Sequence, residues 1–283
     1  MAKTKAAKAP AGAAGTISQA DVQQLAAELD LELTSTLRAQ LRRSIAKAGY
    51  EGTRELVLEA LAKPRAQTLA RRRACERLVL AGVTLVDPAT TYVEAGVVVG
   101  AGTLIQPNSV ISGRTSIGEN CHIGPNTIIC DSRIADGCRI LASVVEGAVL
   151  EEDVTVGPFA HLREGTRLAR GVHIGNFAEV KNARLGRDAK MGHFGYVGDA
   201  QVGDEVNIGA GTVTCNFDGV RKHRTVIGKG AFIGSDTMLV APVKVGDGAT
   251  TGAGAVVTRD VPPDSVAVGM PARARRKRRV KGG

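Results

Sequence analysis

Aliphatic residues recur at every sixth position over long stretches of the 283-residue chain. A period of six fits neither a β-strand, whose faces alternate every second residue, nor an α-helix. It fits a coil of three short strands, in which each aliphatic side chain points inward and a tight turn follows. The 35 glycines suit such turns. The three strict runs are Val99, Ile105, Ile111, Ile117, Ile123 and Ile129; Leu150, Val156, Leu162, Leu168, Ile174 and Val180; and Ile227, Ile233, Leu239, Val245, Thr251 and Val257.

Three such hexads make one coil, so residues 18 apart stack on neighbouring coils. The repeat extends over residues 93–260, which predicts about nine coils. The predicted fold is therefore mainly β, a parallel β-helix of hexapeptide repeats. Its left-handed sense is taken from the known fold and does not follow from the spacing. The repeat is interrupted between Ile208 and Ile227, where the polar and basic segment 214–224 must leave the coil as a loop.

The remaining chain divides by composition. We expect a disordered basic tail over residues 1–16, a helical segment over 17–81, the β-helix domain over 82–265 and a basic tail over 266–283. In the helical segment, Ser18 with Asp21 forms a candidate N-cap, Gly49 ends one helix, and Pro64 suits the first turn of a later one. No catalytic motif lies there.

The net charge of +9 comes from the two tails, since residues 1–16 carry +3 and residues 270–283 carry +7. The nearly neutral body, with 3% aromatic residues, argues against a nucleic-acid platform. A basic tail that binds RNA stays open as an alternative. No apolar run approaches the ~18 residues of a membrane helix. Five cysteines without a CxxC spacing favour reduced thiols in a cytoplasmic protein.

Arg163 and Lys181 each follow an inward aliphatic residue and are 18 positions apart. They should stack outward on neighbouring coils, about 4.8 Å apart. A phosphate would relieve the repulsion between these two cations. The alternative is a surface pair neutralised by Glu164 or Glu179.

His193 is flanked by small residues that leave room for a ligand, and a neutral imidazole is a suitable general base. A purely structural role is the alternative for a single histidine. The five histidines of the chain include no close pair, so we predict no metal site.

Several motifs are longer and more specific than the bare repeat. They are Gly157-Pro158-Phe159-Ala160-His161-Leu162-Arg163, Gly175-Asn176-Phe177-Ala178-Glu179-Val180-Lys181-Asn182, Gly192-His193-Phe194-Gly195-Tyr196, Val206-Asn207-Ile208-Gly209-Ala210-Gly211-Thr212-Val213-Thr214-Cys215-Asn216 and Gly234-Ser235-Asp236-Thr237. Together they closely resemble the acetyltransferase half of the bifunctional glucosamine-1-phosphate N-acetyltransferase/N-acetylglucosamine-1-phosphate uridyltransferase family. The resemblance runs from about Leu78 to about Pro262.

The resemblance implies transfer of acetyl from acetyl-CoA to the amine of glucosamine 1-phosphate, without a metal, in a homotrimer with sites between subunits. It implies a base, His193, oriented by Glu179; sugar-phosphate ligands Arg163, Lys181, Tyr196, Asn207 and Lys222; and acetyl-CoA contacts at the Ala210 backbone, Asn216, Phe217, Ser235 and the Ala253 region. The product would feed UDP-N-acetylglucosamine, peptidoglycan and cell-envelope synthesis.

The chain departs from the family pattern in three respects. Phe217 stands where the family usually has tyrosine, and Glu164 stands where proline is common. The uridyltransferase half has no counterpart, so we expect no uridyltransferase activity and a separate uridyltransferase as a candidate partner. Galactosamine 1-phosphate stays open as the acceptor, and a non-catalytic β-helix scaffold with a basic interaction tail is the rival class.

Overall fold

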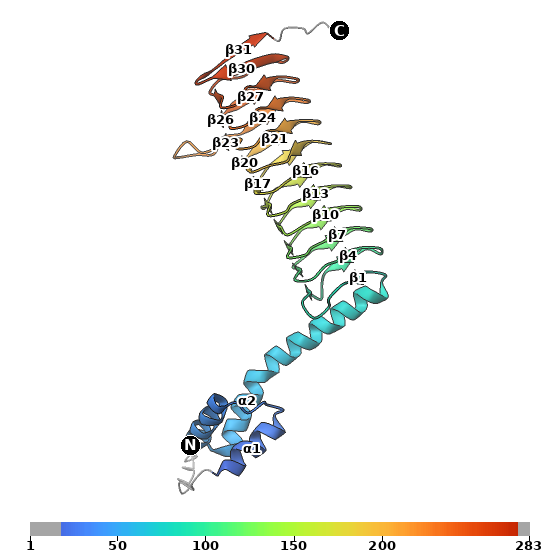
Figure 1. Ribbon diagram of the computed structural model, residues 1–283, viewed down its shortest axis with the longest axis vertical. Coiled ribbons are helices and arrows are strands. Elements are labelled where there is room, and N and C mark those ends of the chain that lie inside the picture. The colour runs from blue at the N-terminus through green and yellow to red at the C-terminus, as the bar shows by residue number, and fades with distance from the viewer. Residues whose placement is uncertain (1–17, 277–283) are drawn as a thin grey trace, which may run out of the picture. The chain divides into compact units, whose positions relative to one another are not determined.

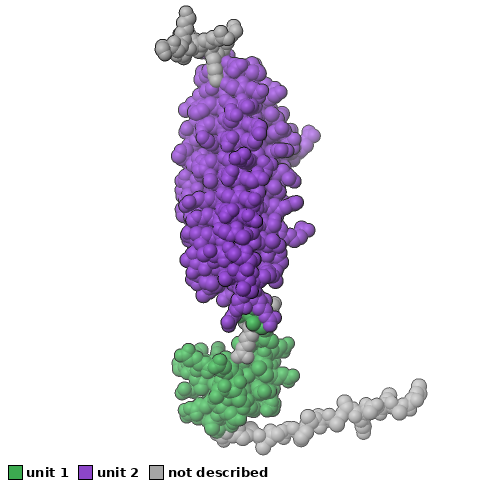
Figure 2. Space-filling model, turned by 90° about the vertical axis from the view of Figure 1, so that its right-hand side faces the viewer, with its two compact units in different colours: residues 1–69 green, residues 70–283 purple. Residues whose placement is uncertain are grey.

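A computed structural model of the chain describes residues 18–276, apart from the side chains of residues 63–65 and 276. The predicted tail over 1–16 and residues 277–283 of the predicted tail over 266–283 therefore lie outside the described residues, whereas residues 266–276 are described and belong largely to two strands. The chain forms two compact units, residues 1–69 and residues 70–283, which are coloured separately in Figure 2. No helix in the described part is long and apolar enough to cross a membrane.

The first unit begins with α1 (Gln19–Glu28), whose start is the predicted cap. The Asp21 N–H donates to the Ser18 hydroxyl at 3.1 Å, and the Ser18 N–H donates to the Asp21 carboxylate at 2.9 Å. This reciprocal pair satisfies two backbone donors that the helix itself leaves free. The small core of this unit consists of Val22, Leu25, Ala26, Leu29, Leu41 and Ile45.

The second helix, α2 (Ser35–Leu80), contains a single non-helical residue, Gly49, with φ 76°. The helix predicted to end at Gly49 therefore does end there, in the left-handed conformation that glycine adopts without a side-chain clash. The helix predicted to start at Pro64 does not start there, because helical backbone is continuous through that position. A proline removes one hydrogen bond, and the bonds on either side of it maintain the helix.

Residues 84–276 form three sheets that wind around one axis (Figure 1). Sheet A contains β1 (Thr84–Leu85), β4 (Leu104–Ile105), β7 (His122–Ile123), β10 (Arg139–Ile140), β13 (Thr155–Val156), β16 (His173–Ile174), β19 (Lys190–Met191), β22 (Asn207–Ile208), β25 (Phe232–Ile233), β28 (Thr250–Thr251), β30 (Ser265–Gly269) and β31 (Ala272–Arg276). Sheet B contains β2 (Tyr92–Val93), β5 (Val110–Ser112), β8 (Ile128–Cys130), β11 (Val144–Glu146), β14 (His161–Leu162), β17 (Ala178–Lys181), β20 (Gly195–Gly198), β23 (Val213–Cys215), β26 (Met238–Val240) and β29 (Val256–Val257). Sheet C contains β3 (Val98–Val99), β6 (Ser116–Ile117), β9 (Arg133–Ile134), β12 (Val149–Leu150), β15 (Arg167–Leu168), β18 (Arg184–Leu185), β21 (Ala200–Val202), β24 (Thr225–Ile227) and β27 (Val243–Val245).

Successive strands belong to successive sheets, and every strand pairs in parallel with the strand one coil away, up to β30. This is the predicted left-handed parallel β-helix of hexapeptide repeats, preceded by helices. The nine strands of sheet C agree with about nine coils.

The core of the β-helix is the predicted ladder of inward side chains, which in the three strict runs are aliphatic at every position except Thr251. All 18 residues of the three strict runs are buried, with exposed fractions of at most 6%. Each buried aliphatic side chain contributes about 1.5–3 kcal/mol relative to exposure, so the ladder is the main source of stability for this unit.

The corners between sheets bring backbone segments very close together. At Gly209, a Cβ atom would lie 2.6 Å from the backbone nitrogen of Ser235, so no other residue fits there without a shift. Two corners carry bulky residues in the left-handed region, Phe159 with φ 60° and Phe177 with φ 58°. Their rings stack at 5.4 Å and are 60% exposed each.

The end of the β-helix is closed by a hairpin. β31 pairs antiparallel with β30, from Gly269 with Ala272 to Ser265 with Arg276. β31 is thereby the terminal strand of sheet A.

Candidate active site

Four of the predicted site residues form a column at the corner between sheets A and B. Strand pairing aligns Lys190, Asn207, Phe232 and Thr250 in sheet A, and three residues later the chain reaches His193, Ala210, Ser235 and Ala253. Hydrogen bonds between the turns confirm the stacking: the Asp236 N–H donates to the Ala210 carbonyl at 2.6 Å, and the Gly254 N–H donates to the Ser235 carbonyl at 2.8 Å. The predicted base thus shares one corner with three predicted acetyl-CoA positions.

The His193 side chain is exposed and forms no hydrogen bond or ion pair with any residue between 18 and 276. Space is open beside it, because a Cβ atom at Gly192 would meet no atom within 4 Å. An imidazole with both ring nitrogens available can accept a proton from a bound ligand.

Backbone donors near this corner differ in availability. The Gly209 N–H donates to the Ile233 carbonyl at 2.8 Å and is therefore already used within the coil. The Ala210 N–H has no hydrogen-bond acceptor among the described residues. Only the second of these donors is free to interact with an oxyanion.

Glu179, Arg163 and Lys181 lie together on the outer face of sheet B. The pairing of Leu162 with Val180 places Arg163 and Lys181 on adjacent coils, as their spacing predicted. Arg163 Nη1 lies 2.7 Å from Glu179 Oε1. Among the described residues no hydrogen bond joins Glu179 to His193, and the carboxylate contacts the Arg163 guanidinium instead.

Lys181 forms no ion pair with the described residues. Its pKa is lowered, first by the positive charge of Arg163 and then by that of Lys222. The sequence left two alternatives open, a phosphate site or a cation pair neutralised by nearby carboxylates. Glu179 neutralises Arg163, whereas Lys181 has no carboxylate partner among the described residues. This arrangement leaves room for an anion beside Lys181.

The interruption of the repeat is a loop between β23 and β24. Its first residue, Asn216, is buried and donates from Nδ2 to Asp199 Oδ2 at 2.6 Å and to the Tyr196 hydroxyl at 3.4 Å. An isolated antiparallel bridge joins Phe217 to Lys222, and the Phe217 ring is 60% exposed.

Within this loop, Asp218 accepts hydrogen bonds from two backbone N–H groups and lies 2.6 Å from His223 Nε2. These donors hold the pKa of the Asp218 carboxyl well below its usual range. His223 is thereby engaged as a structural histidine of the loop.

Asp199 and Asn182 were missed by the sequence analysis. Asn182 Nδ2 donates to Asp199 Oδ1 at 2.5 Å, so Asp199 connects Asn182 to Asn216. The signal was present: these three residues are 17 positions apart, which is the length of a coil that includes one five-residue step.

Asn207 lies apart from the other predicted sugar-phosphate ligands. It is on β22 in sheet A, whereas Arg163, Lys181 and Tyr196 lie on or directly after strands of sheet B. A single chain therefore presents these groups on two faces of the β-helix.

A cavity of about 620 Å³ adjoins the Arg163–Lys181 pair. Glu164, which replaces the usual proline, lies on its wall. The wall carries charges of both signs. Its lining residues are Arg114, Cys130, Asp131, Glu146, Gly147, Arg163, Glu164 and Lys181.

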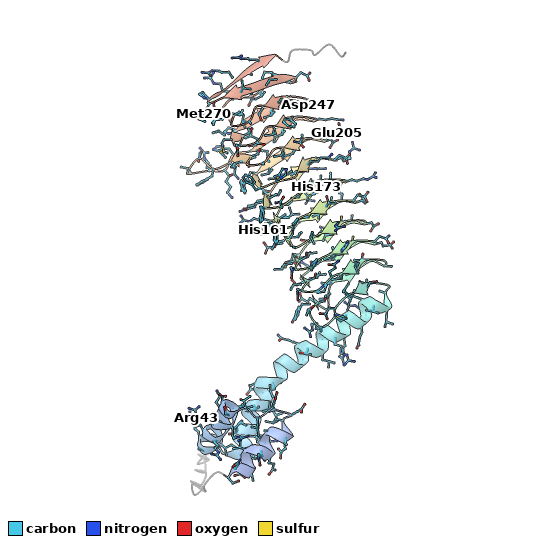
Figure 3. All side chains as sticks on the ribbon, viewed as in Figure 1. Arg43, His161, His173, Glu205, Asp247 and Met270 are labelled. Carbon is cyan, nitrogen blue, oxygen red and sulfur yellow. The ribbon has the colours of Figure 1, made fainter. Side chains whose placement is uncertain are left out.

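The other histidines have partners of their own. His161 Nε2 lies 2.9 Å from Glu146, and His173 Nδ1 lies 2.7 Å from the Thr155 hydroxyl; the two histidines belong to different sheets (Figure 3). Within residues 18–276 no three His, Cys, Asp or Glu side chains are arranged to hold a metal ion.

The fold and this corner define a hexapeptide-repeat protein, and residues 224–259 match the family model described as bacterial transferase hexapeptide (six repeats). The chain is 52% identical over 199 residues to the "Bifunctional protein GlmU" of Thermotoga petrophila, covering 70% of this chain and 45% of that protein. It is 51% identical over 204 residues to the protein of the same name from Pelobacter propionicus, covering 72% and 44%. The resemblance inferred from the motifs, to the acetyltransferase half of this bifunctional family, is confirmed.

The chain spans less than half the length of these curated relatives. Among solved structures, the UDP-N-acetylglucosamine acyltransferase from Campylobacter jejuni is 19% identical, with a TM-score of 0.49 over 66% of this chain and 73% of that one.

Proposed function

We propose that this chain is an N-acetyltransferase that moves acetyl from acetyl-CoA to the amine of glucosamine 1-phosphate. The observation that carries the proposal is the unengaged imidazole of His193, stacked in one column with Ala210, Ser235 and Ala253. The similarity to the bifunctional relatives supports the same reaction.

In the proposed reaction, His193 removes a proton from the sugar ammonium, and the amine then attacks the thioester carbonyl carbon. The Ala210 N–H stabilises the negative oxygen of the tetrahedral intermediate. Attack forms the carbon–nitrogen bond, and the nitrogen of the intermediate then loses its second proton to water. Collapse breaks the carbon–sulfur bond and leaves the neutral amide, and the CoA thiolate receives the proton that His193 took. A thioester is already activated for attack, so this scheme uses no metal ion. Much of the rate comes from orienting two bound substrates.

The sugar phosphate is proposed to bind at Lys181 and Lys222, with Arg163 as a third cation. Their mutual repulsion lowers the pKa of Lys181 in the free protein, and a phosphate dianion would reverse that effect. Because Arg163 is held by Glu179, phosphate binding must either share this guanidinium or draw it away.

The placement of Asn207 on sheet A supports a site completed by a second copy of the chain. In a homotrimer, sheet A of one copy can face sheet B of the next, which brings Asn207 to the Lys181 side. Size-exclusion chromatography with light scattering tests this assembly, and a catalytically competent monomer would contradict it.

We further propose a cytoplasmic location, supported by five free cysteines, and a role in precursor synthesis for peptidoglycan and the cell envelope. A separate uridyltransferase would then use the product. Galactosamine 1-phosphate stays as an alternative acceptor, because the two epimers differ at one hydroxyl.

The test is release of free CoA from acetyl-CoA with glucosamine 1-phosphate, galactosamine 1-phosphate or glucosamine as acceptor. We expect turnover that requires the phosphate and falls by about 10²–10⁴ in His193→Ala. His122→Ala is the matched control, since His122 lies outside the column and interacts with Gln106 at 2.8 Å. No turnover from folded wild-type protein with any acceptor would favour the scaffold.

A further inference from the structure

The Asp199 carboxylate is the point at which three successive coils are connected outside the core. Its Oδ1 accepts from Asn182 on the preceding coil at 2.5 Å, and its Oδ2 accepts from Asn216 on the following coil at 2.6 Å. Both oxygens are therefore committed to amide donors.

The same residue holds both ends of the loop between β23 and β24. Asn216, the first residue after β23, is bound by the Asp199 side chain, and Thr225, the first residue of β24, donates its N–H to the Asp199 carbonyl at 3.2 Å. The segment between these ends, residues 217–224, includes Lys222 and the exposed Phe217.

Asp199 does not form an ion pair with Lys181 or Lys222, although its charge acts on Lys181. The Asp199 carboxylate acts on the charge of Lys181 but accepts hydrogen bonds from two amides, so its position is set by hydrogen-bond geometry. Asn216 is 8% exposed, so its amide has little access to water and depends on this acceptor.

We propose that Asp199 is a positioning residue that fixes the side chain of Asn216 and the root of the loop, and through them the acetyl-CoA subsite. The effect on acetyl-CoA rests on the proposed function, whereas the effect on the loop does not. Asp199 itself takes no part in the bond changes.

The chemistry of the pair contacts gives a specific test. A carboxylate accepts from two amides, but an asparagine at position 199 has one acceptor oxygen, and its own NH₂ group would face a second donor. In the double variant Asp199→Asn/Asn182→Asp, the donor and acceptor exchange places and both contacts can form again.

We expect Asp199→Asn to raise the KM for acetyl-CoA about tenfold or more, as loss of one hydrogen bond to a charged group implies, with a smaller change for glucosamine 1-phosphate. Amide hydrogen exchange over residues 217–224 should become faster in the same variant. The exchanged double variant should restore both measurements. Asp188→Asn is the matched control, because Asp188 also occupies a corner with φ 57° but forms no side-chain hydrogen bond to a described residue.

Failure of restoration by the double variant, or an unchanged KM for acetyl-CoA in Asp199→Asn, would overturn the positioning role. An Asp199→Asn protein with unchanged loop exchange would also overturn it. If wild type shows no acetyl transfer, only the proposed function is contradicted. The hydrogen-exchange experiment needs no substrate and still tests whether Asp199 fixes the loop.

Discussion

Arg163 and Lys181 occupy equivalent positions on consecutive coils, yet only Arg163 is paired with a carboxylate, that of Glu179. The pair therefore presents one compensated and one uncompensated cation to the same face. This asymmetry distinguishes the two side chains as ligands for phosphate and leads to the first three predictions.

Lys181→Met should weaken binding of the sugar phosphate more than it affects acetyl-CoA. Removal of a charged hydrogen-bond donor corresponds to about 10–100-fold in KM for glucosamine 1-phosphate. Lys229→Met is the control, since Lys229 lies 3.4 Å from Glu205 on an exposed corner. Equal KM values for Lys181→Met and wild type would remove Lys181 from the phosphate site.

Glu179→Gln separates two roles for this carboxylate. The 2.7 Å contact indicates that Glu179 acts on Arg163. In that case the variant should lower the KM for the sugar phosphate, and the decrease of kcat at acidic pH should stay at the same pH as in wild type. Loss of an imidazole-orienting carboxylate would instead reduce kcat and shift that decrease to a different pH. Steady-state kinetics between about pH 5 and 9 distinguishes the two results.

The pH dependence of phosphate binding follows from the lowered pKa of Lys181. Lysine is charged below its pKa, so the cation is present at neutral pH and is lost at a lower pH than for an ordinary lysine. We expect the KM for glucosamine 1-phosphate to rise on the alkaline side. In Lys181→Arg this rise should move to higher pH, because a guanidinium stays protonated. An alkaline limb that does not move would contradict the assignment.

The aliphatic ladder should dominate the stability of the β-helix. Ile174 is fully buried between its neighbours, so Ile174→Ala should lower the free energy of unfolding by about 2–5 kcal/mol. Val98 is 65% exposed, so Val98→Ala should change the free energy of unfolding by less than about 0.5 kcal/mol. Urea unfolding midpoints measure both, and similar shifts for the two variants would show that the ladder is not the main source.

Much of the fold could be predicted because one inward aliphatic residue per strand, such as Ile105 or Leu162, makes the period of six visible in the sequence. The stacking of Arg163 on Lys181 followed from the same register. The pairing of Glu179 could not be predicted, because side chains on one outer face have several partners within reach. The prediction at Pro64 was wrong for a different reason. Proline favours the first turn of a helix, but here it lies within a helix that starts earlier in the chain.

The hydrogen bonds of Asp199 could have been predicted from the spacing of its partners in the sequence. Its separation of 17 from both Asn182 and Asn216 follows from one shortened step per coil. A search restricted to 18-residue spacing cannot find such a set. Contacts across the loop, such as Asp218 with His223, lie outside any repeat and required the structure.

The most direct test of the central claim is identification of the product by mass spectrometry after incubation of the chain with acetyl-CoA and glucosamine 1-phosphate. The proposed function predicts a sugar phosphate that is heavier by one acetyl group and carries it as an amide, formed by wild type and lost in His193→Ala. Absence of any acetylated amino-sugar phosphate, from folded and correctly assembled protein, would contradict it.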